Sequence, residues 1–425
     1  MQTQTLVSAF LATVSWLGAN MSYTKDHAQD WLLGKVLSWP EQPAVNKVDT
    51  HHHFVPHFYR GSVVRQGRHD TAKGRLLTCV SSSAVASAGG DPSGWPTPNW
   101  SPRATELLMN RLGGVQTAIH SATAPGTCIL KGAASYKLAR QLNEYAAGVR
   151  DANPSRFGFF ASLPSILDTE AALDELRYAL DTLRADGVTM FTRYGDGNTY
   201  LGHPDLEPIW AELHRRQSVV FVHPTHPVDT AQVNSRMPQP MVDYPHETTR
   251  AAMDMIVMGT RAKYPGCKVI LSHAGGTLPY LISRIATPLS KTPDVAASYA
   301  VGVTHRRVMD DFRSFYYDLA LSASPAVLDM ALKTIPHDHI LYGVGCPVPL
   351  WMQTRRIGCE ICEANANLDG FVRIQSDFSY APPPAYPAFL QELESYDMAP
   401  ELRDQIHFGN ARKLIPRLGR NSSRL

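Results

Sequence analysis

Two histidines that are separated by one residue, His51 and His53, lie in a short apolar run at residues 48–54. Side chains of a β-strand point alternately to its two faces, so this pair would share one face while His52 points to the other. Two imidazoles on one face can bind the same metal ion. The spacing therefore predicts part of a metal centre, with His52 packed on the opposite side of the strand.

Two more histidines, His223 and His273, end later apolar runs of the same kind. A single buried histidine is usually structural, but four at the ends of strands indicate a shared metal site. Histidine ligands with one carboxylate suit Zn²⁺, with Mn²⁺ or Fe²⁺ as alternatives, and a catalytic centre keeps one position open for water or substrate. His226 follows His223 by three residues, and we expect it to line the pocket or donate a hydrogen bond rather than bind the metal.

The elements that would position these histidines are short β-rich runs, which alternate with longer amphipathic segments from residue 48 onward. Most of the longer segments have the period of a helix, and residues 168–185 are a clear example with Asp168 as N-cap. Residues 206–217 and 325–333 have the same pattern. The eight predicted strands are residues 48–54, 115–121, 157–163, 187–194, 218–223, 268–273, 315–321 and 339–343.

Eight strands that alternate with helices predict an α/β fold, a closed (β/α)₈ or TIM barrel. Catalytic residues of that fold lie at the C-terminal ends of the strands, where all four histidines fall. The carboxylate should come from the last strand, but no acid follows residues 339–343 directly. Seven further histidines have no such context, and we expect them on the surface or in loops: His57, His69, His203, His305, His337, His339 and His407.

Composition excludes several classes of protein. The 425 residues carry a net charge of +2, with 18% charged and 44% hydrophobic residues, which indicates a globular protein without a nucleic-acid or anionic-membrane partner. Six cysteines in a chain of this length are no disulfide framework. Residues 6–19 are mostly apolar, but no basic residue precedes them and they are too short to span a bilayer. We expect an N-terminal helix and a cytoplasmic protein without a membrane span, with secretion as the alternative.

Three motifs in order resemble the amidohydrolase superfamily, in its decarboxylase branch. They are VDTHHHFVP at residues 48–56, FVHPTHP at 221–227 and ILSHAGGTLPY at 270–280. The branch includes aminocarboxymuconate-semialdehyde and γ-resorcylate decarboxylases, and the resemblance is closest to fungal 6-methylsalicylate decarboxylases. It extends over residues 47–417 as one barrel domain, between an N-terminal extension at 1–46 and a tail at 418–425.

The resemblance also exposes a split motif. In the family the eighth strand runs directly into a stretch with a metal-binding Asp, whereas here LYG at residues 341–343 is separated from SDFSYAP at 376–382. Asp377 is then the missing carboxylate ligand, and residues 344–375 are an insert. We interpret the insert as a translated intron, with a genuine loop as the alternative. A second insert is expected at about residues 61–83.

The resemblance implies non-oxidative decarboxylation of an aromatic acid with an ortho hydroxyl, such as 6-methylsalicylate to m-cresol in fungal polyketide metabolism. His51, His53, His223 and Asp377 would hold the metal, while Asp377 would also deliver a proton and His273 would orient or exchange protons beside it. Arg193 would either pair with the substrate carboxylate or bridge barrel loops. Three further side chains are expected to bind the substrate as pocket walls: Phe191, His226 and Trp95.

Two rival functions stay open. The first is a mononuclear hydrolase of an amide or lactone, since binuclear members usually take a carboxylated Lys from the fourth strand and residues 187–194 contain no Lys. The second is a catalytically inactive barrel, if residues 344–375 are translated. The family also suggests a homodimer.

Overall fold

The computed structural model describes residues 46–62, 93, 100–111, 114–234, 237–296, 302–343 and 385–419. Trp95 and Asp377, the insert at residues 344–375 and nearly all of the insert at 61–83 lie outside the described residues, as do the apolar N-terminal segment and the last six residues. No helix in the described part of the chain is long and apolar enough to cross a membrane.

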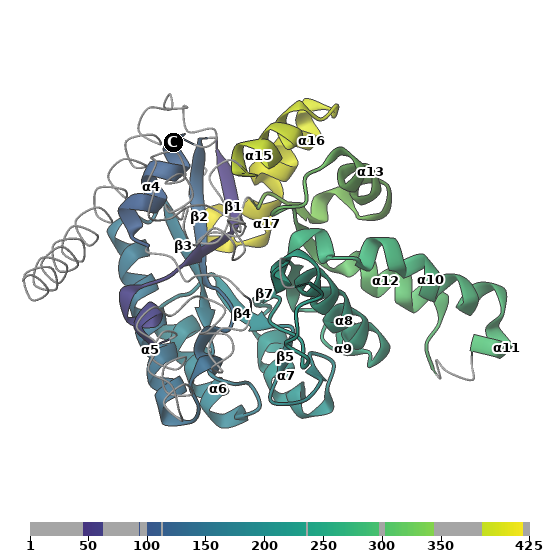
Figure 1. The fold of residues 1–425 in the computed structure, drawn as a ribbon, viewed down its shortest axis with the longest axis horizontal. Helices are drawn as coiled ribbons and strands as arrows, with labels where there is room; N and C mark the ends of the chain where they lie inside the picture. Colours follow the sequence, from purple (N-terminus) through teal and green to yellow (C-terminus); the bar gives the residue numbers. More distant parts are fainter. Residues whose placement is uncertain are drawn as a thin grey trace, which may run out of the picture.

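Eight parallel strands form one sheet that curves into a nearly closed barrel (Figure 1), which confirms the predicted (β/α)₈ fold. The backbone N–H and the hydroxyl of Thr50 both donate to the carbonyl oxygen of Tyr342, at 3.0 and 2.9 Å, and so connect the first strand to the end of the last. In sheet order the strands are β1 (Lys47–Phe54), β2 (Val115–Ala122), β3 (Phe157–Ser162), β4 (Gly187–Phe191), β7 (Val219–His223), β8 (Lys268–Leu271), β9 (Tyr316–Asp318) and β10 (Ile340–Leu341).

The fourth strand is shorter than the sequence predicts. Residues 187–194 were expected to form one strand, but β4 ends at Phe191 and a separate antiparallel pair follows, β5 (Arg193–Tyr194) with β6 (Thr199–Tyr200). Where the backbone leaves the strand, the Tyr194 hydroxyl accepts a hydrogen bond from Phe191 N, at 2.9 Å.

Helices surround the strands, as the sequence periodicity predicts. The side chain of Asp168 accepts a hydrogen bond from Ala171 N, so Asp168 is the N-cap of α6, which continues into a π-helical turn at Tyr178–Thr182. The helices are α4 (Pro102–Arg111), α5 (Ala133–Ala152), α6 (Thr169–Arg177), α7 (Glu207–Arg215), α8 (Asp243–Val257), α9 (Thr260–Lys263), α10 (Leu278–Lys291), α11 (Pro293–Ala296), α12 (His305–Ser314), α13 (Pro325–Thr334), α15 (Ala385–Ser395), α16 (Pro400–Asp404), α17 (Asn410–Leu414) and α18 (Pro416–Gly419).

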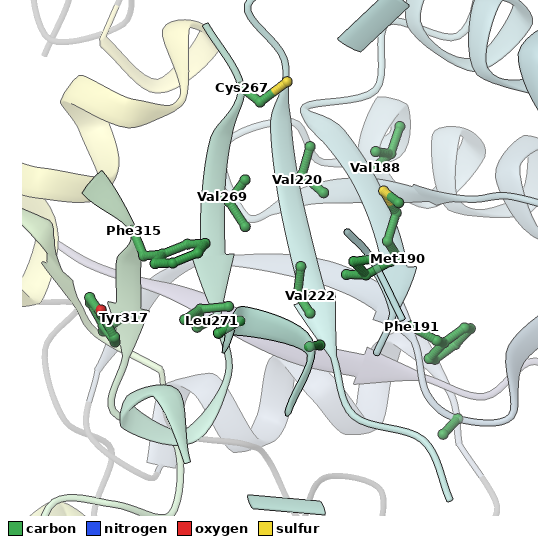
Figure 2. Close-up of a cluster of buried hydrophobic side chains, with 14 of the residues drawn as sticks. Val188, Met190, Phe191, Val220, Val222, Cys267, Val269, Leu271, Phe315 and Tyr317 are labelled. Atoms are coloured by element: carbon green, nitrogen blue, oxygen red, sulfur yellow. The ribbon is translucent and has the colours of Figure 1, made fainter. Parts of the chain in front are cut away.

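Alternate residues of each strand contribute to two separate cores. Residues on the outer faces pack against the helices, such as Val220 and Val222 of β7 beside Val269 and Leu271 of β8 (Figure 2). Residues on the inner faces form a second cluster, which α17 and α18 close from the N-terminal end of the barrel. Its members are Val48, Ile119, Phe160, Val219, Phe221, Ile270, Leu341, Ala411, Leu414, Ile415 and Leu418.

Candidate metal centre

Three of the predicted ligands meet at the C-terminal end of the barrel. The Nε2 atom of His53 lies 3.2 Å from Nε2 of His51 and 3.0 Å from Nε2 of His223. All three side chains are buried, and their ligand atoms lie within 4.8 Å of one another. Two alternate positions of β1 and the last residue of β7 therefore place three imidazole nitrogens around one point.

The hydrogen bonds on the other sides of these rings fit a metal. His51 Nδ1 lies 3.0 Å from a carboxylate oxygen of Asp318, and His53 Nδ1 lies 3.2 Å from the carbonyl oxygen of Ser121. The Ser121 hydroxyl oxygen also lies 3.1 Å from His53 Nδ1. Because the Asp318 carboxylate and the Ser121 carbonyl only accept, the geometry favours the tautomers with the proton on Nδ1, in which each Nε2 presents a lone pair to the shared point. Burial, followed by the neighbouring His53, His51 and His273, holds the pKa of His223 well below its ordinary value, so this ring is neutral and able to bind a cation.

A β-bulge in β1 sets the direction of these side chains. Val48 faces the inner cluster, and plain alternation would then turn His51 outward, but the pairing of β1 with β2 shifts by one residue between Asp49 and His52. Asp49 accepts from His51 N at 3.1 Å and from His52 Nδ1 at 2.9 Å, which ties the bulge together. His52 points away from the centre toward Thr105 of α4, as predicted.

His273 also lies in this group, although it follows β8 in a turn rather than ending the strand. Its ring centroid is 4.9 Å from that of His51 and 6.0 Å from that of His223. The backbone is left-handed at four successive residues, with φ of 56° at His273, 53° at Ala274, 77° at Gly275 and 64° at Gly276. Side chains disfavour that conformation, so the turn is held by the surrounding structure, as is typical of functional sites.

The two glycines of this turn are required by close contacts as well as by φ. A Cβ atom on Gly275 would lie 2.7 Å from the ring of Tyr317, and one on Gly276 would lie 2.0 Å from the carbonyl oxygen of Pro245. Neither position leaves room for a side chain. The glycine pair in the motif at residues 270–280 thus fixes where the His273 turn can lie against β9 and α8.

Asp318, the last residue of β9, is a buried residue of the site that the sequence reasoning missed. Its carboxylate accepts from His51 Nδ1, from His273 N at 3.1 Å and from Ala320 N at 3.0 Å. The sequence did not mark it, because the predicted seventh strand at residues 315–321 continues past Asp318, whereas β9 ends at Asp318 and so places it at the catalytic end of the barrel. A second missed residue is Tyr244 of α8, whose ring centroid lies 6.3 Å from that of His223.

Two of the predicted pocket walls, Phe191 and His226, lie in the described part of the chain. Phe191 ends β4, and its ring centroid is 6.3 Å from that of His223. It packs so closely on Gly126 that a Cβ there would lie 2.3 Å from the ring. Burial, and next the nearby Arg193, lower the pKa of His226 to about 4, so its imidazole is neutral at physiological pH.

Arg193 bonds to the backbone of two loops in this structure. Its Nε donates to the carbonyl of His226 at 2.8 Å, Nη1 donates to those of Gly195 and Gly197 at 2.9 Å each, and Nη2 donates to that of Pro227 at 3.3 Å. This arrangement matches the loop-bridging role that the sequence left open beside carboxylate binding.

The expectation that His407 lies on the surface was wrong. It is 6% exposed, and its Nε2 lies 3.3 Å from Glu394 of α15. His407 belongs to a π-helical segment, Gln405–Gly409, which packs beside β1 and the end of β10 and so buries the ring.

Residues 48–417 match the Amidohydrolase family, and the chain belongs to that family. Its fold and histidine cluster had already pointed to this class.

Named relatives narrow the resemblance. The chain is 43% identical, over 88% of its length and 97% of the other chain, to a 6-methylsalicylic acid decarboxylase from Penicillium expansum. It is 48% identical, over 71% of its length and 84% of the other chain, to a 6-methylsalicylic acid decarboxylase from Aspergillus aculeatus. Among solved structures it resembles a dihydroxybenzoic acid decarboxylase from Polaromonas with bound manganese and 2-nitroresorcinol, with a TM-score of 0.64 at 20% identity over 87% of this chain and 97% of that chain. That similarity supports the fold.

Proposed function

We propose that the protein is a metal-dependent, non-oxidative decarboxylase of an aromatic acid with an ortho hydroxyl, with 6-methylsalicylate as substrate and m-cresol and carbon dioxide as products. The observation that carries the proposal is the buried group His51, His53 and His223, whose Nε2 atoms converge at the end of an amidohydrolase-family barrel. Relatives at 43% and 48% identity named for this substrate support it.

The donor set suits a divalent cation with mixed nitrogen and oxygen ligands. We propose His51, His53, His223 and Asp377 as ligands, and Zn²⁺ as the cation, with Mn²⁺ or Fe²⁺ as alternatives. When bound, the ion would supply Lewis-acid stabilisation of charge on the phenolate and carboxylate oxygens of the substrate. Because the three histidines are buried, water is largely excluded and such electrostatic interactions are strengthened.

The chain's own residues must move one proton and expel one carbon dioxide. Asp377 delivers a proton to the ring carbon that bears the carboxylate, and His273 orients or exchanges protons beside it. The bond from that carbon to the carboxylate then breaks, its electron pair returns to the ring, and aromaticity is restored. Phe191 and the neutral His226 line the pocket with Trp95, and Arg193 keeps the loops around it in place.

Incubation of the purified protein with 6-methylsalicylate and each metal tests the reaction directly. We expect stoichiometric m-cresol and carbon dioxide, with loss of both after treatment with a chelator. A panel of amides and lactones is run in parallel. Hydrolysis of a panel member without any m-cresol would overturn the decarboxylase and favour the mononuclear hydrolase.

Residues 344–375 separate Gly343, at the end of the eighth strand, from Ser376 and Asp377. We propose that they are a translated intron, which sequencing of the spliced transcript decides. A variant that lacks them joins Gly343 directly to Ser376, and we expect it to bind metal and decarboxylate at least as well as the full chain. Metal binding by neither form would favour an inactive barrel.

Cellular location and assembly are further parts of the proposal. We propose a cytoplasmic enzyme, which agrees with the free thiols of Cys128 and Cys267. We also propose a homodimer, which sedimentation of the purified chain would test.

A further inference from the structure

We propose that Asp318 is a positioning residue that couples the metal ligand His51 to the turn that carries His273. The inference rests on the metal centre proposed above and adds a residue to which no role has been assigned. Asp318 lies at the end of β9, fully buried between β8 and β10. Its carboxylate accepts a hydrogen bond from the side chain of His51, a proposed metal ligand. It also accepts one from the backbone N–H of His273, which is proposed to orient or exchange protons.

The geometry divides the carboxylate between two tasks. Oδ2 accepts from Nδ1 of His51 at 3.0 Å, while Oδ1 accepts from the backbone N–H groups of His273 at 3.1 Å and Ala320 at 3.0 Å. Both oxygens therefore act as acceptors at once. A carboxylate is the side-chain group that can accept at two oxygens in this way.

The first task is to select the tautomer of His51. With its proton on Nδ1, His51 directs the Nε2 lone pair at the point shared with His53 and His223. The other neutral tautomer would place a proton there and oppose a cation. Oriented partners of this kind also raise the basicity of the ligating nitrogen.

The second task is to hold the left-handed turn. His273 and Ala274 both have positive φ, a conformation that is unfavourable for a residue with a side chain. The hydrogen bond from His273 N to Asp318 is made inside the buried site, where an unsatisfied N–H is costly. Asp318 thereby fixes the starting point of the His273 turn relative to the ring of His51.

Close packing leaves the carboxylate little freedom to relax. Gly343, which follows β10, approaches so closely that an added Cβ would lie 3.1 Å from the Cβ atoms of both Asp318 and His51. The acid, the ligand and the end of the last strand thus form one packed unit. A change in the hydrogen bonding of Asp318 must then be absorbed by His51 or by the His273 turn.

The variant Asp318→Asn preserves shape but replaces one acceptor by an NH₂ donor. If the amide nitrogen faces His51, that ring must adopt the Nε2–H tautomer, which opposes the metal. If it faces the turn, it meets the two backbone N–H groups of His273 and Ala320. Either orientation should weaken metal binding, by roughly 10- to 100-fold in Kd.

The control is Asp186→Asn. Asp186 is also buried, with 1% of its side chain exposed, and it also accepts at both oxygens, from Phe159 N and from Arg417. It lies before β4, at the opposite end of the barrel. This variant should lose stability with no change in Kd for the metal.

The experiment titrates Mn²⁺ into the full chain, into Asp318→Asn and into Asp186→Asn, with the free ion followed by electron paramagnetic resonance. Histidine-selective ¹⁵N NMR of the metal-free proteins reports the His51 tautomer. We expect the Nδ1–H form in the wild type and in Asp186→Asn, and weaker Mn²⁺ binding only in Asp318→Asn. Equal loss of affinity in both variants, or an Nε2–H tautomer in the wild type, would overturn the role of Asp318.

The readouts separate this inference from the proposed function. If the wild type binds Mn²⁺ but makes no m-cresol, the proposed decarboxylase activity is wrong. The Mn²⁺ affinity of the variants and the His51 tautomer still test the role of Asp318. If the full chain binds no metal, or Asp318→Asn does not fold, the tautomer of wild-type His51 decides alone.

Discussion

The inside of the barrel has two layers that differ in kind although the same strands build them. The lower layer is apolar and continuous with the C-terminal helices, whereas the upper layer holds the histidines, Asp318 and several hydroxyl groups. On five strands the change occurs within one step of two residues: Ile119 to Ser121, Phe160 to Ser162, Phe221 to His223, Ile270 to Ser272, and Tyr316 to Asp318.

The difference shows how one fold separates stability from chemistry. Apolar area buried in the lower layer stabilises the barrel at about 25 cal/mol per Å². The upper layer does the opposite, since it buries polar atoms such as the Ser162 and Thr189 hydroxyls, for which the described part of the structure provides no hydrogen-bond partner. The barrel tolerates the unfavourable burial of these polar atoms at the ends of its strands because the apolar layer beneath them is rigid and well packed.

The largest expected effect comes from removing a histidine of the upper layer. His53→Ala should abolish metal binding and lower kcat/KM by roughly 10³ or more, because Lewis-acid stabilisation is worth several kcal/mol and each 1.36 kcal/mol is tenfold in rate. Its fold should persist, since the barrel core is untouched. Metal analysis, m-cresol formation and circular dichroism measure the three properties. Retention of stoichiometric metal in this variant would contradict the proposed ligand set.

A substitution in the lower layer should instead lower stability and leave metal binding and catalysis unchanged. Leu414→Ala, in α17, removes a buried side chain from the inner cluster and should cost about 2–5 kcal/mol in the free energy of unfolding. Kd for the metal and kcat should stay near wild type below the melting temperature. Leu414→Met, which conserves volume, is the control and should cost less than about 1.5 kcal/mol. Urea unfolding and metal titration on the same samples measure both quantities, and a parallel loss of affinity would mean that the layers are coupled.

Two glycines with positive φ allow a sharper test of the upper layer, one in the His273 turn and one outside it. Gly276 and Gly132 both have positive φ, 64° and 55°, but an added Cβ meets Pro245 at 2.0 Å in the first case and nothing within 4 Å in the second. Gly132→Ala should cost about 1–3 kcal/mol of stability through backbone strain alone. Gly276→Ala should cost more and should also lower kcat, because the turn that carries His273 must move.

Thermal unfolding and steady-state kinetics of the two glycine variants provide the test. Equal losses of stability with unchanged kcat in both would show that the position of His273 does not matter for the reaction.

Periodicity and motif order predicted the fold, the strand positions within a few residues, and the meeting of His51, His53 and His223. They could not predict the bulge at Asp49, because alternation alone carries no information about an extra residue that a carboxylate holds in place. Asp318 was missed because its role depends on distances to His51 and His273, which are far away in sequence. His407 was misplaced for the same reason, since its partner Glu394 is brought to it by the packing of helices rather than by a local pattern.

The smallest expected effect concerns pH and an ion pair at the start of β1. Glu394 of α15 pairs with Lys47 at the start of β1, at 2.6 Å, and lies 3.3 Å from His407. Burial alone would raise the pKa of Glu394, but its pairing with His407 and Lys47 outweighs burial and lowers the pKa from 4.5 to about 2. A carboxyl with a lowered pKa stabilises the folded state fully above about pH 4.5, and that contribution is lost as the pH falls toward 2.

The melting-temperature difference between wild type and Glu394→Gln should therefore be constant from pH 7 to about 5 and should shrink below pH 4.5. It should be small throughout, because the Glu394 side chain is 35% exposed and solvent screens the pair. Glu401→Gln, at an exposed position of α16, controls for the change of charge. Because the partners of Glu394 are Lys47 and His407 rather than the histidines of the metal centre, its protonation should lower stability without changing metal affinity measured at the same pH in the two proteins. A loss of metal affinity confined to Glu394→Gln would show instead that the lower end of β1 controls the placement of His51 and His53, and that the two layers are not independent.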